Sequence, residues 1–103
     1  MATKMKERAK EATKSRPKTE KPHLWKVILL NDEITTIDFV IMLLMTVFEK
    51  KYDVADALTH QIHVGTSGVA GVYPKSIAEA KKIEAEELAR KYGYPLQILI
   101  ERE

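Results

Sequence analysis

The stretch that decides the fold is WKVILLNDEITTIDFVIMLL, residues 25–44, which joins an apolar strand to an apolar helix through one polar turn. Residues 25–30 are rich in β-branched side chains and apolar on nearly both faces, which predicts a strand buried inside a sheet. The polar turn Asn31-Asp32-Glu33 ends that strand. Residues 37 to about 50 contain good helix formers and no Gly or Pro, and Thr35 with Asp38 approximates a capping box. We therefore expect a helix there that is buried on almost every side.

A second helix and a second strand are predicted downstream of this stretch. The helix begins near Asp53, since the helix macrodipole favours an acidic side chain at an N-terminus, and it runs to about His63. The run GTSG, residues 65–68, breaks it. Residues 69–73 are β-like, and Pro74 closes that strand because proline cannot donate a ladder hydrogen bond.

A third helix and a last strand complete the predicted domain. Ser76 and Glu79 form a full capping box, and Gly93 is placed to end the helix as its C′ residue. Residues 96–100 follow Pro95 as a strand. The expected fold is a small two-layer α+β domain, in which a three-stranded antiparallel sheet packs with three helices. The apolar stripe of the third helix is predicted to comprise Ile77, Ala85, Leu88 and Tyr92.

The composition separates a basic extension, residues 1–22, from a folded domain, residues 23–103. The chain has 103 residues, 45% of them hydrophobic, and no cysteine, so one domain without disulfides or cysteine nucleophiles is expected. Residues 1–22 hold 8 Lys or Arg against 3 Asp or Glu and are nearly free of large apolar side chains, which predicts a flexible arm. The rest of the chain is mildly acidic, with 9 basic residues against 12 acidic ones.

No targeting or membrane-spanning segment is evident in the sequence. The extension lacks the apolar core of a secretory signal, and although its Ala, Arg and Lys content resembles that of a transit sequence, its acidic residues argue against one. The longest apolar run, residues 39–45, is too short to cross a bilayer. We therefore expect a cytoplasmic protein with no membrane partner.

Little in the sequence indicates catalysis or metal binding. His60 and His63 are spaced three residues apart on the predicted second helix, but no cluster supplies the remaining ligands of a metal site. No glycine-rich phosphate loop follows the first strand, and no nucleophile has a recognisable context. The basic arm alone is a weak nucleic-acid signal, since the domain lacks a basic and aromatic strand. Neither an enzyme, a cofactor nor a nucleic-acid partner is expected.

Three segments resemble the ClpS family of N-degron adaptors, in the same order and at the same spacing. They are WKVILLNDEITTIDFVIMLL, HVGTSGVAGVYPKSIAEAKK and YPLQILIERE, and the resemblance covers about residues 24–103 without gaps. Its specific pieces are the K-V-x-L-x-N-D-[DE] turn, the Ile62-His63 pair, G-V-Y and A-E-x-K. The resemblance implies a monomeric, non-enzymatic adaptor that binds bulky hydrophobic N-termini (Phe, Tyr, Trp or Leu) and delivers them to the N-terminal domain of a ClpA- or ClpC-type AAA+ unfoldase.

The resemblance also implies which residues bind the free N-terminus. Asn31, Asp32 and His63 match the family residues that hold the α-ammonium group. An ammonium has three donors and no acceptor, so three converging acceptors satisfy it, and the imidazole of His63 can accept only while it is neutral. An acetylated N-terminus cannot be satisfied in this way.

The side-chain pocket and the docking surface are carried over in the same manner. Glu79 and Lys81 match the A-E-x-K signature of the unfoldase-docking surface, although a solvated helix face explains Lys81 equally well. Thr59 stands where the family usually has Met, which predicts a smaller and wetter pocket wall, and Ile37 exchanges a flexible gatekeeping Met for a stiff β-branched residue. The implied pocket comprises Leu30, Thr35, Ile37, Val40, Thr59 and Leu96.

Two alternatives remain open from the sequence. In one, Thr59 and Ile37 have removed the ability to read N-termini, and the protein is a degenerate adaptor that only docks on the unfoldase and modulates it. In the other, the basic arm serves a nucleic-acid or ribosome-associated module, which predicts binding that depends steeply on salt.

Overall fold

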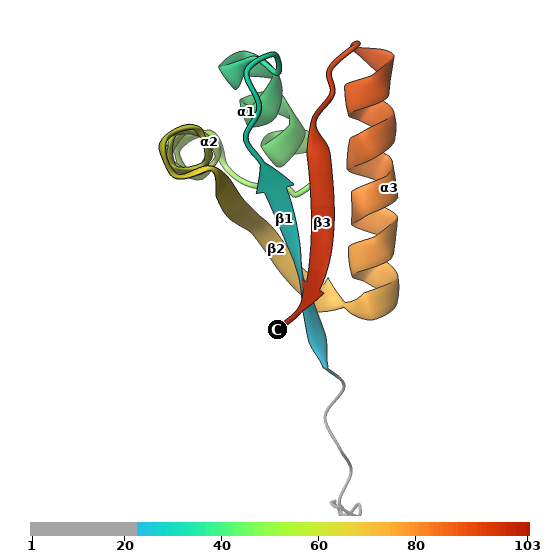
Figure 1. Ribbon diagram of the computed structural model, residues 1–103. Coiled ribbons are helices and arrows are strands. Elements are labelled where there is room, and N and C mark those ends of the chain that lie inside the picture. Colours follow the sequence, from blue (N-terminus) through green and yellow to red (C-terminus); the bar gives the residue numbers. More distant parts are fainter. Residues whose placement is uncertain (1–22) are drawn as a thin grey trace, which may run out of the picture.

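The computed structural model describes residues 23–103, and Figure 1 shows its six elements in chain order. The predicted basic extension, residues 1–22, lies outside the described residues. No helix within the described part of the chain is long and apolar enough to span a membrane. The elements are β1 (Leu24–Leu30), α1 (Ile37–Thr46), α2 (Tyr52–Gly65), β2 (Ser67–Pro74), α3 (Lys75–Lys91) and β3 (Gln97–Arg102).

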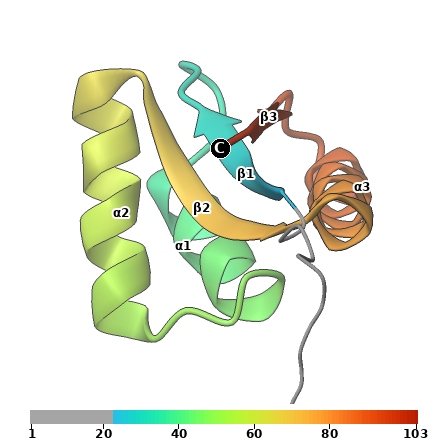
Figure 2. The ribbon, with the colours of Figure 1, turned by 90° about the horizontal axis from the view of Figure 1, so that it is seen from below.

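The sheet is antiparallel and has the order β2-β1-β3, so the first strand of the chain lies at its centre. Val27 pairs with Gly71 on one side and with Ile100 on the other, and the β1–β2 register shifts after Val27. Figure 2 shows α1 beneath the sheet, α2 on the β2 side and α3 on the β3 side. The predicted two-layer α+β fold, with three strands and three helices, is confirmed.

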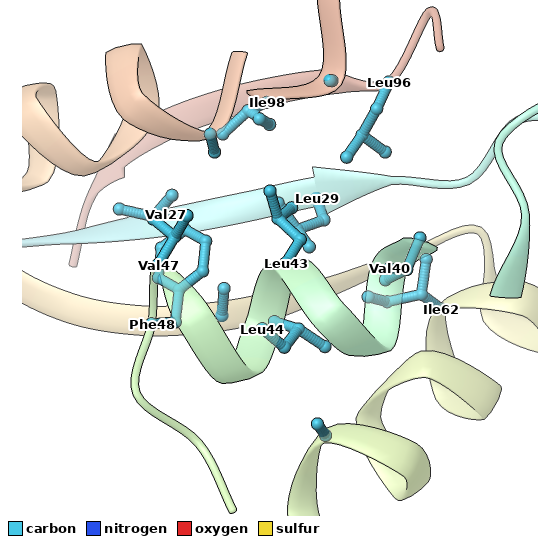
Figure 3. Close-up of a cluster of buried hydrophobic side chains, with 14 of the residues drawn as sticks. Val27, Leu29, Val40, Leu43, Leu44, Val47, Phe48, Ile62, Leu96 and Ile98 are labelled. Atoms are coloured by element: carbon cyan, nitrogen blue, oxygen red, sulfur yellow. The ribbon is translucent and has the colours of Figure 1, made fainter. Parts of the chain in front are cut away.

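The core forms between one face of β1 and the buried side of α1. Val27 and Leu29 are two residues apart, so both point to that face (Figure 3). They are inaccessible to solvent, as is Leu43 of α1. Ile28 points to the other face and is still only 9% exposed. The central strand is therefore apolar on nearly all of both faces, as its sequence predicts, because among the three strands of residues 23–103 it alone has neighbours on both sides.

The ends of α1 differ from the prediction. Thr36, and not Thr35, caps the helix, because its hydroxyl accepts a hydrogen bond from the Phe39 N–H at 3.1 Å. The helix ends at Thr46, earlier than Lys50, and the chain leaves it through Glu49 in the left-handed region, at φ 58°. Local periodicity extends the predicted helix too far because Val47 and Phe48 are apolar and buried, as core-facing helix residues are.

The start of α3 was also predicted wrongly, and its end correctly. The helix begins at Lys75 directly after Pro74, so Ser76 lies inside the first turn and makes no capping hydrogen bond. At the other end Gly93 has φ 81°, its N–H donates to the Arg90 carbonyl, and the Tyr94 N–H donates to the Ala89 carbonyl. This pattern is a Schellman motif, in which the left-handed residue favours glycine.

The buried stripe of α3 consists of small residues. Ala78, Ala85 and Ala89 are buried, whereas Ile77 and Tyr92 are 46% and 55% exposed. Of the four stripe residues predicted, Ala85 is therefore buried and Leu88 packs against the core, while the other two were wrong. Alanines let a helix approach a sheet closely, and a sequence pattern that weights large apolar side chains misses such a face.

Candidate functional site

The polar turn after β1 lies against the C-terminal end of α2. The Asn31 N–H donates to the Thr66 carbonyl at 2.8 Å, and the Thr66 N–H donates to the Ile62 carbonyl at 3.0 Å. Thr66 has φ 80° and turns the chain from α2 into β2. Because His63 precedes Thr66 by three residues, it lies within one helical turn of the point where the Asn31 backbone is attached. Asn31 and His63 are both exposed at this corner.

The Asp32 carboxylate is held in place by the residues that follow it. Its Oδ1 accepts hydrogen bonds from the Ile34 N–H at 2.8 Å and the Thr35 N–H at 2.7 Å, and its Oδ2 accepts one from the Thr35 hydroxyl at 2.7 Å. Thr35 therefore fixes the acid of the turn, and does not cap α1. A carboxylate has about four lone-pair positions, so after these three hydrogen bonds Oδ2 retains acceptor capacity toward a ligand.

These hydrogen bonds also set the ionisation of Asp32. Burial of the carboxyl raises its pKa, but the hydrogen bonds from the Thr35 backbone, the Thr35 hydroxyl and the Ile34 backbone together outweigh burial. The pKa of Asp32 is therefore lowered from its ordinary value of 3.8. The side chain carries a full negative charge at neutral pH.

This lowered pKa predicts a pH dependence of stability. The stabilisation due to Asp32 is fully present above its unfolded pKa of 3.8 and is lost as the pH falls through the lower folded value. In urea titrations from about pH 6 to about pH 2, we expect the free energy of unfolding to fall more steeply for the wild type than for Asp32→Asn. All other carboxyls are shared by the two proteins, so parallel curves would contradict the assigned hydrogen bonds.

An apolar wall lies beside the turn, between α1, α2 and the residue that precedes β3. Val40, Ile62 and Leu96 are buried in one cluster, and Figure 3 shows Val40 and Ile62 side by side. Leu30 and Thr35 are half-buried. Ile37 is 37% exposed in the first turn of α1, a position from which a side chain can border an opening. The predicted pocket residues thus come from the end of β1, the turn and first turns of α1, the second half of α2 and the residue before β3.

The Thr59 side chain presents a less polar surface than its residue type suggests. It is only 3% exposed, and its hydroxyl donates to the Ala55 carbonyl of its own helix at 2.7 Å. That bond uses the single donor of the hydroxyl. The side chain is smaller than the Met of the family pattern, but the proton of its hydroxyl is not offered to a ligand.

The arrangement suits one kind of ligand. Asn31 and His63 lie at the same corner of the backbone, and Asp32 adds a fixed negative charge. Apolar side chains lie behind them. An ammonium group beside an apolar side chain satisfies both regions at once, since charge-assisted hydrogen bonds are stronger than neutral ones and apolar burial adds to them.

The two residues implied in docking have different environments. Glu79 is exposed on α3. Lys81 is half-buried, its Nζ donates to the Val47 carbonyl at 2.7 Å, and the same atom lies 5.9 Å from the centre of the Tyr73 ring. Lys81 is therefore not on a freely solvated helix face.

Sequence reasoning missed two residues that shape the site. Thr66 supplies the carbonyl that holds Asn31, and its only signal in the sequence is the glycine-flanked run in which it lies. Thr36 caps α1, but Asp38 follows it by only two residues. Asp38 follows Thr35 by three residues, which is the spacing of a capping box, so the sequence favours Thr35. Among residues 23–103, no three His, Cys, Asp or Glu side chains gather as metal ligands, and His60 instead lies 3.3 Å from Asp56.

The chain is similar in sequence and in fold to known proteins. The family model described as "ATP-dependent Clp protease adaptor protein ClpS" matches residues 20–99. The ClpS adapter of Helicobacter hepaticus is 44% identical over 80% of this chain and 83% of its own length. That of Clostridium acetobutylicum is 47% identical over 85% of this chain and 87% of its own length.

A solved structure is similar over the whole of its chain. Agrobacterium tumefaciens ClpS2, bound to L-phenylalaninamide, is 37% identical, with a TM-score of 0.78 over 81% of the present chain and 100% of its own. The family model covers most of the described residues, and both relatives align over more than four fifths of their own length. The chain therefore belongs to the ClpS family, the adaptor proteins of the ATP-dependent Clp protease.

Proposed function

We propose that this adaptor binds the free N-terminus of substrate proteins that begin with Phe, Tyr, Trp or Leu. The observation that carries the proposal is the corner at which the fixed Asp32 carboxylate follows the backbone attachment of Asn31 to Thr66, one turn from His63. Asn31, Asp32 and His63 supply the three acceptors for the α-ammonium group. The first side chain of the substrate enters the pocket of Leu30, Thr35, Ile37, Val40, Thr59 and Leu96.

The expected affinity is moderate, which suits cargo that has to be passed on. Burying a Phe or Leu side chain contributes roughly 1.5–3 kcal/mol. Each hydrogen bond to the charged ammonium contributes about 1.5–3 kcal/mol. The cost of association and of ordering the peptide is subtracted from this sum.

The ligand of the similar solved structure supports the proposal. L-phenylalaninamide, bound to the Agrobacterium protein, has a free α-amino group, a benzyl side chain and an uncharged amide in place of the carboxylate. It is thus the smallest mimic of a polypeptide that begins with Phe. Because that protein binds such a ligand, we favour an adaptor that recognises N-termini over one that only docks on the unfoldase.

The partner and setting of the proposed function follow from the family. The adaptor delivers its cargo to the N-terminal domain of a ClpA- or ClpC-type AAA+ unfoldase in the cytoplasm, acts as a monomer and performs no chemical step. Glu79, exposed on α3, belongs to the proposed docking surface. The energy for unfolding comes from the unfoldase.

A peptide array tests this proposal most directly. Peptides that differ only in their first residue are immobilised through their C-termini and probed with the full chain. We expect signal for Phe, Tyr, Trp and Leu and none for Asp, Glu or Gly, because the pocket is apolar and a small residue buries little surface. Uniform absence of signal would favour the degenerate adaptor. Signal that follows net peptide charge and vanishes with salt would favour a module acting through the basic arm.

Removal of single acceptors is expected to weaken binding of a Phe-initiated peptide by about tenfold or more, since each removes a bond to a charged group. Binding of a labelled peptide by the variants Asp32→Ala and His63→Ala is measured by fluorescence anisotropy. His60→Ala on the exposed face of the same helix is the matched control and should bind as the wild type does. If both site variants retain wild-type affinity and fold, the assigned roles are wrong.

A further inference from the structure

Lys81 caps the C-terminal end of a helix to which it does not belong. The last carbonyls of an α-helix have no partner within the helix and carry partial negative charge. In α1 no basic residue occupies the last turn, and the carbonyl of its C-cap residue Val47 instead accepts a hydrogen bond from Lys81 of α3 at 2.7 Å. The ammonium group thus supplies both a donor and a compensating charge.

The surroundings of the ammonium group fix its position. The ring of Tyr73 lies 5.9 Å from Nζ, and that ring covers Gly71, where a Cβ atom would collide with it. Burial, together with the nearby charge of Glu49, raises the pKa of the Tyr73 hydroxyl, so the ring remains neutral. Glu49 itself adopts φ 58° in the link between α1 and α2. Lys81 therefore holds the point at which the chain turns from one helix into the next.

This link is one of the contacts that orient α2, and a second lies at the opposite end of the helix. At its start, residues 47–51 connect it to the end of α1 that Lys81 holds. At its end, the Thr66 carbonyl binds the Asn31 N–H. The proposed α-amino acceptors lie at the second attachment, whereas Thr59, which is 3% exposed, lies between the two along α2.

We infer that Lys81 is a positioning residue that sets the shape of the side-chain pocket. The inference rests on the proposed function. When the first attachment is loosened, α2 pivots about the second, so the pocket wall shifts while the acceptors of the turn and His63 stay together. Loss of the Lys81 contact should weaken recognition of a large first side chain and leave recognition of the α-amino group intact.

The test compares two peptides in the full-length chain. Binding of a peptide that begins with Phe depends on both the α-amino acceptors and the side-chain pocket. Binding of the same peptide beginning with Ala depends almost entirely on the α-amino acceptors. For Lys81→Met, we expect the ratio of the Phe to the Ala affinity to fall by about three- to tenfold, while the Ala affinity stays within about twofold of wild type. General destabilisation of a folded protein would not separate the two peptides.

Two further variants provide matched controls. Lys82→Met removes the neighbouring lysine, which pairs with Glu86 on the same helix at 2.7 Å, and should leave the ratio unchanged. Lys81→Arg should restore the wild-type ratio, because a guanidinium can donate to a carbonyl and stack on an aromatic ring. The inference is overturned if Lys81→Met keeps the wild-type ratio or if Lys82→Met lowers it equally.

A second variant covers the case in which Lys81→Met does not fold. Tyr73→Leu keeps the lysine and removes the ring that flanks it, so the ratio should again fall; an unchanged ratio in a folded Tyr73→Leu protein would overturn the inference. If the wild type itself shows no preference for the Phe peptide, the proposed function fails, which is a different result from a normal wild type and an unaffected Lys81 variant.

Discussion

Acetylation of the α-amino group of a Phe-initiated peptide is expected to weaken its binding to this adaptor by about 100-fold or more. The free peptide offers an ammonium with three donors and a positive charge, whereas the acetylated one offers a single neutral N–H. The acetyl carbonyl also brings an acceptor toward Asp32, whose carboxylate stays ionised because Thr35 and Ile34 donate to it. The acceptors of the site would then be left partly unpaired.

The measurement is a competition titration in which both peptides displace the same labelled ligand. A pair of peptides that begin with Asp, free and acetylated, serves as the control, because neither fills the apolar pocket and both should bind weakly. Equal affinities for the free and the acetylated Phe peptides would exclude recognition of the chain end. Such a result would leave the family membership intact and remove the proposed reading of N-termini.

The fold follows largely from local signals in the sequence. The apolar character of β1, interrupted only by Lys26, identifies the strand with two neighbours. Gly93 identifies the end of α3 because the Schellman motif needs a left-handed residue. One of the errors falls where two neighbouring residues are able to fill the same role. Thr35 and Thr36 are both able to cap α1, and the choice is made by Asp32, which takes the hydroxyl of Thr35 for itself.

The candidate site is less visible in the sequence than the fold. Composition and spacing show only a polar turn, and the roles of its residues came from the family resemblance. A hydrogen bond between Asn31 and Thr66 brings the turn to α2, and one between Lys81 and Val47 caps the C-terminal end of α1. Both are tertiary contacts between residues more than 30 positions apart, which no local periodicity encodes.

Because β2 lies close to α2 at Gly68, a single methyl group added there should have a large effect on stability. Gly68 is buried at the start of β2, and a Cβ atom there would lie 2.7 Å from Cγ1 of Ile62 and 3.2 Å from Cδ1 of Leu58. Ile62 is only 3% exposed, so it has no space into which to retreat. Gly68→Ala should therefore lower the free energy of unfolding by about 1–3 kcal/mol, as overpacking of a core does.

The same substitution should also weaken binding of the Phe peptide, because Ile62 precedes His63 and an outward shift of α2 moves the imidazole away from Asn31. Gly65→Ala is a matched control three residues earlier: nothing lies within 4 Å of its Cβ position, and its φ is not positive. There we expect a gain of about 0.4–1 kcal/mol, since alanine restricts the unfolded chain. Urea denaturation measures both, and a Gly68→Ala protein as stable as Gly65→Ala would show that α2 is free to move away from β2.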